Sequence, residues 1–296
     1  MKSLFGFLGL FSLLTTLAQA ETLDTSKIEQ IIGLKGALNT NEGVFKVTSA
    51  RNDVKISVDD WTMPPFMGLA SWAAFTEAKM GGAMVMGDTV LFQDEVNPAM
   101  SVALDNGLSV TALHNHFFYD EPKVYFMHIG GEGSAEKLAT AIHKVWNKVK
   151  EIRAANPQPR TTFGGTPLPD KSSIAAKTVE DILGMKGQVN NGMVKIVIGR
   201  TAKMMDTKVG KEMGVNTWAA FAGADDNAVV DGDFAVLEDQ LQPVLKSLRN
   251  GGINIVAIHH HMTHEEPRIL FLHYWGKGKS SDLARAVKAA LDTQTK

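Results

Sequence analysis

An internal duplication constrains the fold of this chain more than any other feature. The pattern His-x-His, followed by Glu-Pro and a further His, occurs in residues 114–128 and again in residues 259–273. The two copies keep one register, because 259 − 114 and 273 − 128 both give 145. Eight of the nine histidines lie in these two segments, and only His143 lies outside them. Self-similarity at a fixed offset indicates a repeated structural unit, so two similar halves are expected.

Weaker matches extend the duplication along the chain. Trp-Ala-Ala-Phe occurs at residues 72–75 and at residues 218–221. In each half a short helical pattern ends at a glycine, Gly33 or Gly184, the residue type that best adopts the left-handed conformation after a helix. Strand-like runs and helical patterns follow in the same order in both halves. We therefore expect an α+β fold, a tandem duplication of one unit with a mainly antiparallel sheet and helices packed on the sheets.

The composition of one internal segment indicates where the two copies meet. Residues 154–175 contain several prolines and glycines and have no apolar periodicity, which is typical of a linker. We assign residues 21–153 to the first repeat and residues 176–296 to the second.

Residues 1–20 have the pattern of a cleavable signal peptide. Lys2 supplies a positive charge, residues 4–17 are apolar, and Ala18-Gln19-Ala20 fits a small-x-small cleavage site. A membrane anchor is the alternative, but a spanning helix needs ~20 apolar residues and this run is shorter. We expect a periplasmic or secreted protein with no membrane anchor after cleavage.

The composition excludes several classes of chemistry. The chain has no cysteine, which rules out disulfides, thiolate metal sites and a cysteine nucleophile. The formal net charge of −2 gives no overall basic character, so nucleic acid is not expected as a partner. Any metal must be held mainly by imidazole nitrogen and carboxylate oxygen atoms.

Two glycine-aspartate pairs lie within strand-like runs. Gly87-Asp88 falls inside residues 83–92, and Gly232-Asp233 falls inside residues 229–237. Glycine and aspartate are residue types of tight β-turns. We therefore expect each run to fold back on itself as a hairpin at its Gly-Asp pair.

The histidines of each segment are spaced so that they can meet. Side chains two apart in a strand point to one face, so His114 and His116 project together. If the chain returns as a neighbouring strand, His128 comes beside them, because Cβ atoms of cross-strand neighbours lie roughly 4.5–5.5 Å apart. Three imidazoles and a carboxylate suit a divalent metal ion. Zinc is expected first, with iron or manganese as alternatives.

Glutamates near the histidines are the expected carboxylates. Glu121 is a candidate fourth ligand or catalytic base, and Glu95 is a second candidate for the base. The expected metal ligands are His114, His116, His128 and Glu121 in the first copy, and His259, His261, His273 and Glu266 in the second. The first copy keeps the cleaner alternation, so we expect it to be the functional one.

Several functions fit this pattern. The first is binding of a divalent metal ion by an exported protein. The second is a metal-dependent hydrolase that acts on cell-envelope or carbohydrate material, in which the metal activates water. The third is a binding module without metal that holds a small polar ligand. A structural hydrogen-bond network of histidines or a weak surface metal site would also give the pattern.

The joint set of motifs resembles that of a known family. Asp94-Glu95-Val96-Asn97-Pro98, Leu113-His114-Asn115-His116 and the Trp-Ala-Ala-Phe and Glu-Pro motifs are similar to the LppY/LpqO family of exported bacterial proteins, whose domain has no known function. The resemblance implies export and a duplicated architecture, and it implies no reaction. The members that give the family its name are lipoproteins. Because this chain has no cysteine for lipid attachment, membrane attachment is not carried over.

Overall fold

The computed structural model describes residues 23–79 and 81–295, and the expected signal peptide lies outside these residues. The helices and strands of the first half are α1 Thr25–Ile32, β1 Gly36–Asn39, β2 Val44–Ala50, β3 Ser57–Val58, β4 Trp61–Thr62, β5 Ala70–Glu77, β6 Ala83–Phe92, α2 Gln93–Asp105, β7 Ser109–His114, β8 Asp120–Glu121, β9 Val124–Gly133 and α3 Ala135–Ala155. Those of the second half are α4 Ala176–Leu183, β10 Gln188–Asn190, β11 Met193–Gly199, β12 Ala202–Met204, β13 Thr207–Val209, β14 Asn216–Ala224, β15 Asn227–Leu237, α5 Leu241–Asn250, β16 Asn254–His259, β17 Glu265–Glu266, β18 Ile269–Gly278 and α6 Ser280–Asp292. The same order of elements in both halves confirms the expected duplication and the α+β class.

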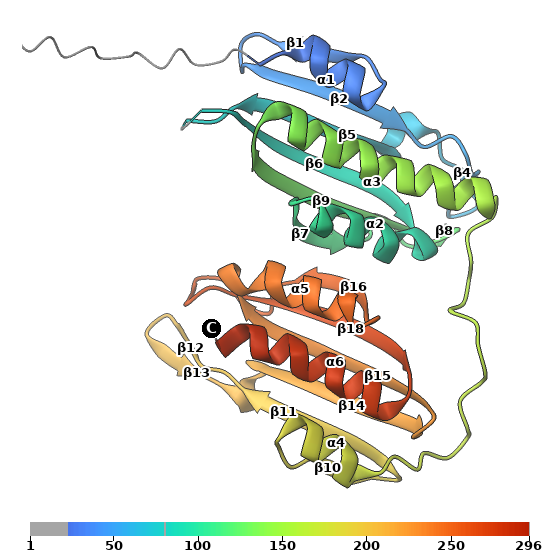
Figure 1. Cartoon of the computed structure of the whole chain (residues 1–296), viewed down its shortest axis with the longest axis vertical. Helices are drawn as coiled ribbons and strands as arrows, with labels where there is room; N and C mark the ends of the chain where they lie inside the picture. Colours follow the sequence, from blue (N-terminus) through green and yellow to red (C-terminus); the bar gives the residue numbers. More distant parts are fainter. Residues whose placement is uncertain (1–22, 80, 296) are drawn as a thin grey trace, which may run out of the picture.

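The two halves share one twelve-stranded sheet of order β1-β2-β5-β6-β9-β7-β16-β18-β15-β14-β11-β10 (Figure 1). The strand pairings within it are antiparallel, as expected. The halves join where β7 and β16 pair at Leu113 and Ile258. Since 258 − 113 is again 145, this pairing lies on an approximate twofold axis that relates the repeats.

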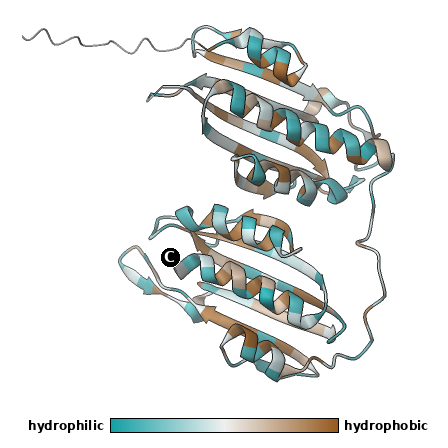
Figure 2. Cartoon of the chain, in the orientation of Figure 1, coloured by the Kyte–Doolittle hydropathy of each residue, from teal (hydrophilic) through white to brown (hydrophobic). Residues whose placement is uncertain are grey.

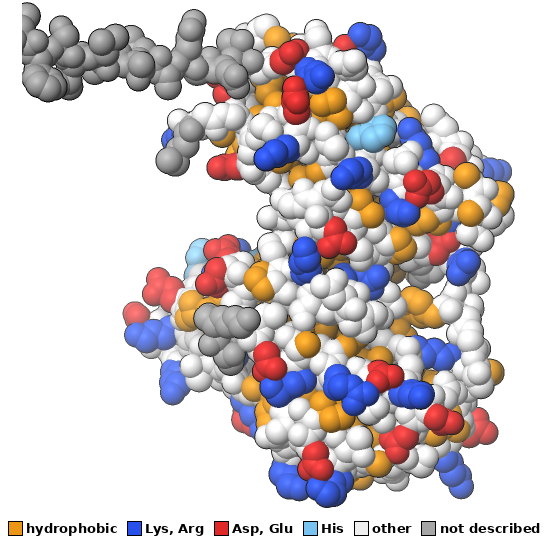
Figure 3. Space-filling view, viewed as in Figure 1, with side chains coloured by type: hydrophobic (Ala, Val, Ile, Leu, Met, Phe, Trp, Pro, Cys, Tyr) orange, Lys and Arg blue, Asp and Glu red, His pale blue; other side chains and the backbone are white. Residues whose placement is uncertain are grey.

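Alternating burial along the strands explains the layers. In β14 burial alternates residue by residue from Asn216 to Ala224, because successive strand side chains point to opposite faces. One face packs with every α-helix in a single apolar core, and the helices lie on that side of the sheet (Figure 1). The long helices carry both hydrophobic and hydrophilic residues, as a helix with one face in a core requires (Figure 2). Charges of both signs are interspersed over the helix-covered side (Figure 3).

The face opposite the helices, here called the open face, is covered only in part. Each half places a small three-stranded sheet against it, β4-β3-β8 in the first half and β13-β12-β17 in the second. These small sheets bury apolar side chains against the central strands, around Phe126 in the first half and Phe271 in the second. The histidine segments lead from the central strands into these small sheets, and their histidines therefore lie beside the two clusters.

Two side-chain amides, one buried and one half-buried, hydrogen-bond across the junction of the halves. Asn97 at the start of α2 donates from Nδ2 to Ile255 O (3.1 Å) and accepts from Ile255 N (2.7 Å). Gln242 in α5 does the same with Val110, donating to its carbonyl (2.9 Å) and accepting from its N–H (2.9 Å). Val110 and Ile255 flank the irregular positions of β7 and β16. Each half thus supplies hydrogen-bond partners for a backbone N–H and C=O at the irregular position of an inner strand of the other half.

The two expected Gly-Asp hairpins are wrong. Strands β6 and β15 run without a break through Gly87-Asp88 and Gly232-Asp233. Glycine stands there because neighbours approach closely: a Cβ on Gly87 would lie 2.8 Å from Trp72 O. At Gly232 it would lie 2.2 Å from the hydroxyl of Tyr274, which donates a hydrogen bond to Trp218 O. Both aspartates therefore sit in the middle of central strands.

Candidate metal centre

Three histidines and an aspartate of the second half meet on the open face. His259 ends β16, His273 lies in β18, and Asp233 in β15 is directly opposite His273. These three strands are neighbours in the sheet. His261 follows two residues after His259, in the loop that leads to β17. The twofold alternation of strand side chains and the order of the strands together bring the four side chains to one place.

Donor atoms converge in this half. The Nε2 atoms of His259 and His261 are 3.1 Å apart, and Nε2 of His261 is 3.3 Å from Oδ2 of Asp233. One ligand atom from each of these three residues lies within 4.8 Å of the other two. The ring of His273 stacks on that of His259, with centroids 4.8 Å apart. Zinc binds such atoms at about 2.0–2.2 Å, so donors this close can share one ion.

Backbone carbonyls orient two of the imidazoles. Nδ1 of His261 is 3.2 Å from Gly214 O, and Nδ1 of His273 is 3.3 Å from Gly232 O. A carbonyl only accepts, so Nδ1 carries the proton and Nε2 keeps its lone pair. A ring nitrogen that donates to a carbonyl while the other faces the ion is the usual arrangement of metal-binding histidines.

Buried polar atoms without hydrogen-bond partners lie beside the histidines of both halves. Asp233 is 2% exposed and Asp88 is 6% exposed. The Oδ1 atom of each carboxylate has no hydrogen-bond partner within residues 23–79 and 81–295, and neither does Nδ1 of His259. An ionised carboxylate buried without compensation is costly. A bound cation would offset that cost.

The first half repeats the arrangement more loosely. Asp88 lies opposite His128, and their Oδ2 and Nε2 atoms are 4.0 Å apart. The ring centroid of His114 lies 5.1 Å from those of His116 and His128. Among the residues that the structure describes, only the second half brings three ligand atoms within 4.8 Å of one another. The geometry therefore favours the second copy, whereas the sequence pattern favoured the first.

An aromatic ring supports the loop histidine in each half. His116 stacks on Phe126 with centroids 3.4 Å apart, and His261 stacks on Phe271 at 3.5 Å. Both phenylalanines are almost fully buried in the small clusters beneath the open face. The buried phenylalanine in each half thus holds the ring of a histidine that lies in the loop after the end of a strand.

Burial shifts the pKa values of several side chains in the two histidine clusters. Burial, together with the neighbouring His273 and His261, lowers the pKa of His259 to about 4. Burial also lowers the pKa of His116. It raises the pKa of Asp233, an effect that His273 and His261 partly offset. His259 and His116 are therefore neutral at pH 7, which is the form that binds metal.

The structure does not bring the expected glutamates to the histidines. Glu121 and Glu266 are exposed, and their backbones pair with Ser57 and Lys203 in the small sheets. In the described residues neither carboxylate has a hydrogen bond or ion pair with a histidine. Each follows a buried acid in its two-residue strand, so its own side chain points to the opposite side.

Glu95 has a structural environment. It is fully buried, and Arg51 donates to both of its carboxylate oxygens, at 2.6 and 2.7 Å. Arg153 Nε lies 2.7 Å from Oε1, and Phe92 N donates to Oε2 at 2.8 Å. Guanidinium and backbone donors thus occupy both carboxylate oxygens of Glu95, so it is poorly placed to accept a proton from substrate.

The sequence reading missed Asp88 and Asp233. A signal was present, because 233 − 88 is 145, the same offset that relates the histidines. It was missed because Gly-Asp is common in tight β-turns, so both aspartates were assigned to turns. In the structure each aspartate faces the last histidine of its segment across a strand pair.

The fold and this site define a class: a duplicated α+β protein with a three-histidine and aspartate cluster in each half. A family model described as Domain of Unknown Function (DUF1259) matches residues 26–148 and residues 177–293. The chain belongs to this family and contains two copies of its domain. No curated protein and no solved structure shows significant similarity to it. No helix in the described part of the chain is long and apolar enough to cross a membrane.

Proposed function

We propose that this protein binds divalent metal ions outside the cytoplasm, with zinc as the first expected ion and iron or manganese as alternatives. The ligands in the second half are His259, His261, His273 and Asp233. In the first half they are His114, His116, His128 and Asp88. The observation that carries the proposal is the convergence of His259 Nε2, His261 Nε2 and Asp233 Oδ2 within 4.8 Å.

The chemistry of the donors supports this choice of ions. Neutral imidazole suits zinc and iron, carboxylate suits manganese, and three imidazoles with one carboxylate combine both ligand types. The absence of cysteine excludes thiolate ligands. The aspartates replace Glu121 and Glu266 in the proposal, because their buried oxygens lack partners in the described residues whereas the glutamates are exposed.

Export is part of the proposal and rests on the N-terminal pattern of a positive charge, an apolar run and a small-x-small site. The resemblance of the motifs to the LppY/LpqO group supports the same location. Both support a location in the periplasm or outside the cell, without a cysteine-linked lipid.

The test is metal loading of protein purified without a histidine tag. After chelator treatment and dialysis against zinc, manganese or iron, about two equivalents of one metal per chain are expected, by the affinity of three-histidine sites. Less than about 0.2 equivalents for every metal would contradict the proposal. His259→Ala should lower the content by about one equivalent. His143→Ala, which removes the single histidine outside the clusters, should leave it unchanged.

A metal-dependent hydrolase is the second candidate. It is favoured by a cavity of about 380 Å³ that His273 itself lines. A metal at this site would supply activation of water, and the cavity would hold the substrate beside it. Release of product from a glycan or envelope polymer by zinc-loaded protein, abolished by His259→Ala, would support hydrolysis.

A further inference from the structure

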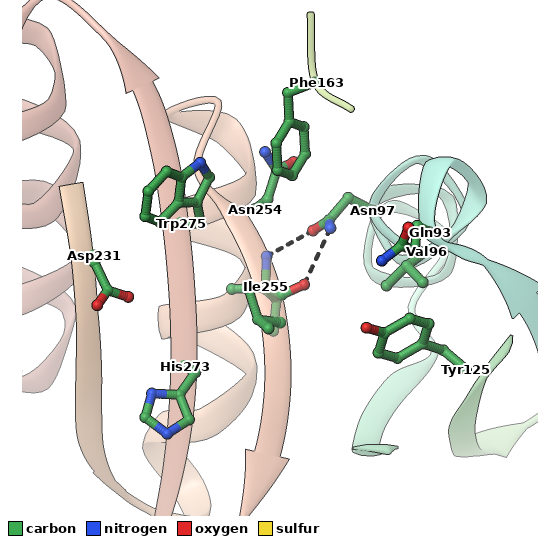
Figure 4. A pocket seen from close by; sticks show the side chains of 11 residues that line it. Gln93, Val96, Asn97, Tyr125, Phe163, Asp231, Asn254, Ile255, His273 and Trp275 are labelled. Carbon is green, nitrogen blue, oxygen red and sulfur yellow. Dashed lines mark hydrogen bonds between the residues drawn. The ribbon is translucent and has the colours of Figure 1, made fainter. Parts of the chain in front are cut away.

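The cavity beside His273 lies at the seam between the halves (Figure 4). One wall is the open face of the second half, with Asp231, His273 and Trp275. The other wall comes from the first half, with the start of α2 and Tyr125. Phe163 of the linker adds an exposed aromatic ring to the lining. The volume of about 380 Å³ is within the range of small-molecule sites, about 300–1,000 Å³.

Three of these residues form one row across neighbouring strands. Trp275 in β18 lies opposite Asp231 in β15 and opposite Asn254 in β16. The next row on the same face holds His273 and Asp233. Two residues along a strand span about 7 Å, so a group in the first row lies next to the candidate metal ligands.

The row offers both donors and acceptors around an aromatic face. Asn254 Oδ1 accepts from Arg249 Nη1 at 2.9 Å, which directs the NH2 group of the amide away from Arg249. Asp231 is exposed and offers two carboxylate oxygens as acceptors. Trp275 supplies a broad apolar surface between them, and the hydroxyl of Tyr125 points toward this space (Figure 4).

The first half has no such row. The positions 145 residues before Asp231 and Trp275 are Met86 and Gly130. The candidate metal ligands are duplicated, but the tryptophan and the acid beside them are not. A feature added to one copy only, next to the copy with the tighter histidine cluster, indicates a ligand specific to that copy.

We propose that this cavity binds a pyranose unit of a glycan, stacked on Trp275 and hydrogen-bonded to Asp231 and Asn254. A sugar ring has an apolar face of C–H groups and a rim of hydroxyls that both donate and accept, which matches an indole flanked by an acid and an amide. An organic cation would use Trp275 and Asp231 but would leave the amide donors of Asn254 without an acceptor. The role of the sugar as a neighbour of a bound metal rests on the proposed function; its binding to the cavity does not.

The test is binding of the tag-free protein to an array of bacterial, fungal and plant glycans, followed by calorimetric titration with the oligosaccharide that binds best. Trp275→Ala and Asp231→Asn are expected to weaken binding about tenfold or more, equivalent to about 1.4 kcal/mol. Trp275→Phe, which keeps an aromatic face, should lose less. Trp61→Ala removes an exposed tryptophan of β4 and should bind as the parent protein does.

Two results would overturn the proposal. One is an array on which no glycan binds the parent protein above the level of Trp275→Ala. The other is saturable binding of choline, lost in Trp275→Ala, with no glycan binding, which would show a site for an organic cation. Metal content is measured on the same samples. Glycan binding without metal would contradict only the metal proposal, and full metal content without glycan binding would contradict only this one.

Discussion

Asp233 Oδ2 lies 3.3 Å from His261 Nε2, although the two residues come from a central strand and from a loop that follows another strand. Asp233 is buried, and its second oxygen has no partner in the described residues. Substitution of this aspartate therefore tests the proposed centre, because removal of its charge changes the affinity for a cation without removing an imidazole.

Asp233→Asn should weaken zinc binding at the second site about 10–100-fold, since the amide keeps the shape but supplies no charge. Asp226→Asn removes the same charge from the exposed turn before β15 and should have no effect. Competition titration with a fluorescent zinc chelator measures both. Equal affinities for the two variants would exclude Asp233 as a ligand.

The metal-free protein should lose stability as the pH falls from about 6.5 toward 4 because of His259. Its pKa is lowered in the folded state, so in this window the unfolded chain binds a proton that the folded chain does not. The contribution is complete above the unfolded pKa and is lost as the pH falls. Asp233, whose pKa is raised, acts in the opposite direction.

Urea unfolding at several pH values, in the presence of chelator, compares the parent protein with His259→Asn. The variant should show a flatter dependence in this window, because it lacks the titrating imidazole. NMR titration of the His259 ring should give a midpoint near 4. A midpoint at the ordinary value of about 6.5 would contradict the prediction.

Asn97→Ala and Gln242→Ala should each lower the free energy of unfolding by about 1–3 kcal/mol. Each amide serves a backbone N–H and C=O of the other half, and these groups would be left without their present partners. Asn147→Ala, which removes an exposed bond to Glu151, should change the stability by less than about 0.5 kcal/mol. Similar midpoints for all three variants in urea would show that the seam depends on other contacts.

Two buried threonines should respond in opposite ways to valine. Thr89 is buried with an unpartnered hydroxyl in the described structure, so Thr89→Val should be neutral or stabilising. Thr217 Oγ1 accepts from Ala235 N at 3.0 Å, so Thr217→Val should cost about 1 kcal/mol or more. Thermal unfolding of both variants decides this. A larger loss for Thr89→Val would mean that its hydroxyl has a partner such as bound water.

The sequence predicted the features that depend on local pattern. The 145-residue offset gave the duplication, and the spacing of His114, His116 and His128 correctly placed three imidazoles near one another. The position of Asp88 beside His128 depends on the pairing of two strands, which the local sequence pattern does not indicate. Whether Gly87 turns or continues a strand is decided by the approach of Trp72 O, which no local pattern records.

Three further features depend on contacts between residues distant in the chain. The buried position of Glu95 is set by Arg51 and Arg153, both far from it in the chain. The outward direction of Glu121 is set by its pairing with Ser57 in a small sheet that the sequence did not indicate. The seam bonds of Asn97 likewise join residues 158 positions apart.

The most direct test of the metal centre is an anomalous difference map at the zinc absorption edge, from crystals of tag-free protein soaked in zinc. A peak is expected among Asp233 Oδ2 and the imidazoles of His259, His261 and His273, at about 2.0–2.2 Å from its ligands. A weaker peak is expected between Asp88 and the first set of histidines. A map with no peak at Asp233, or with zinc only on exposed histidines such as His143, would contradict the account.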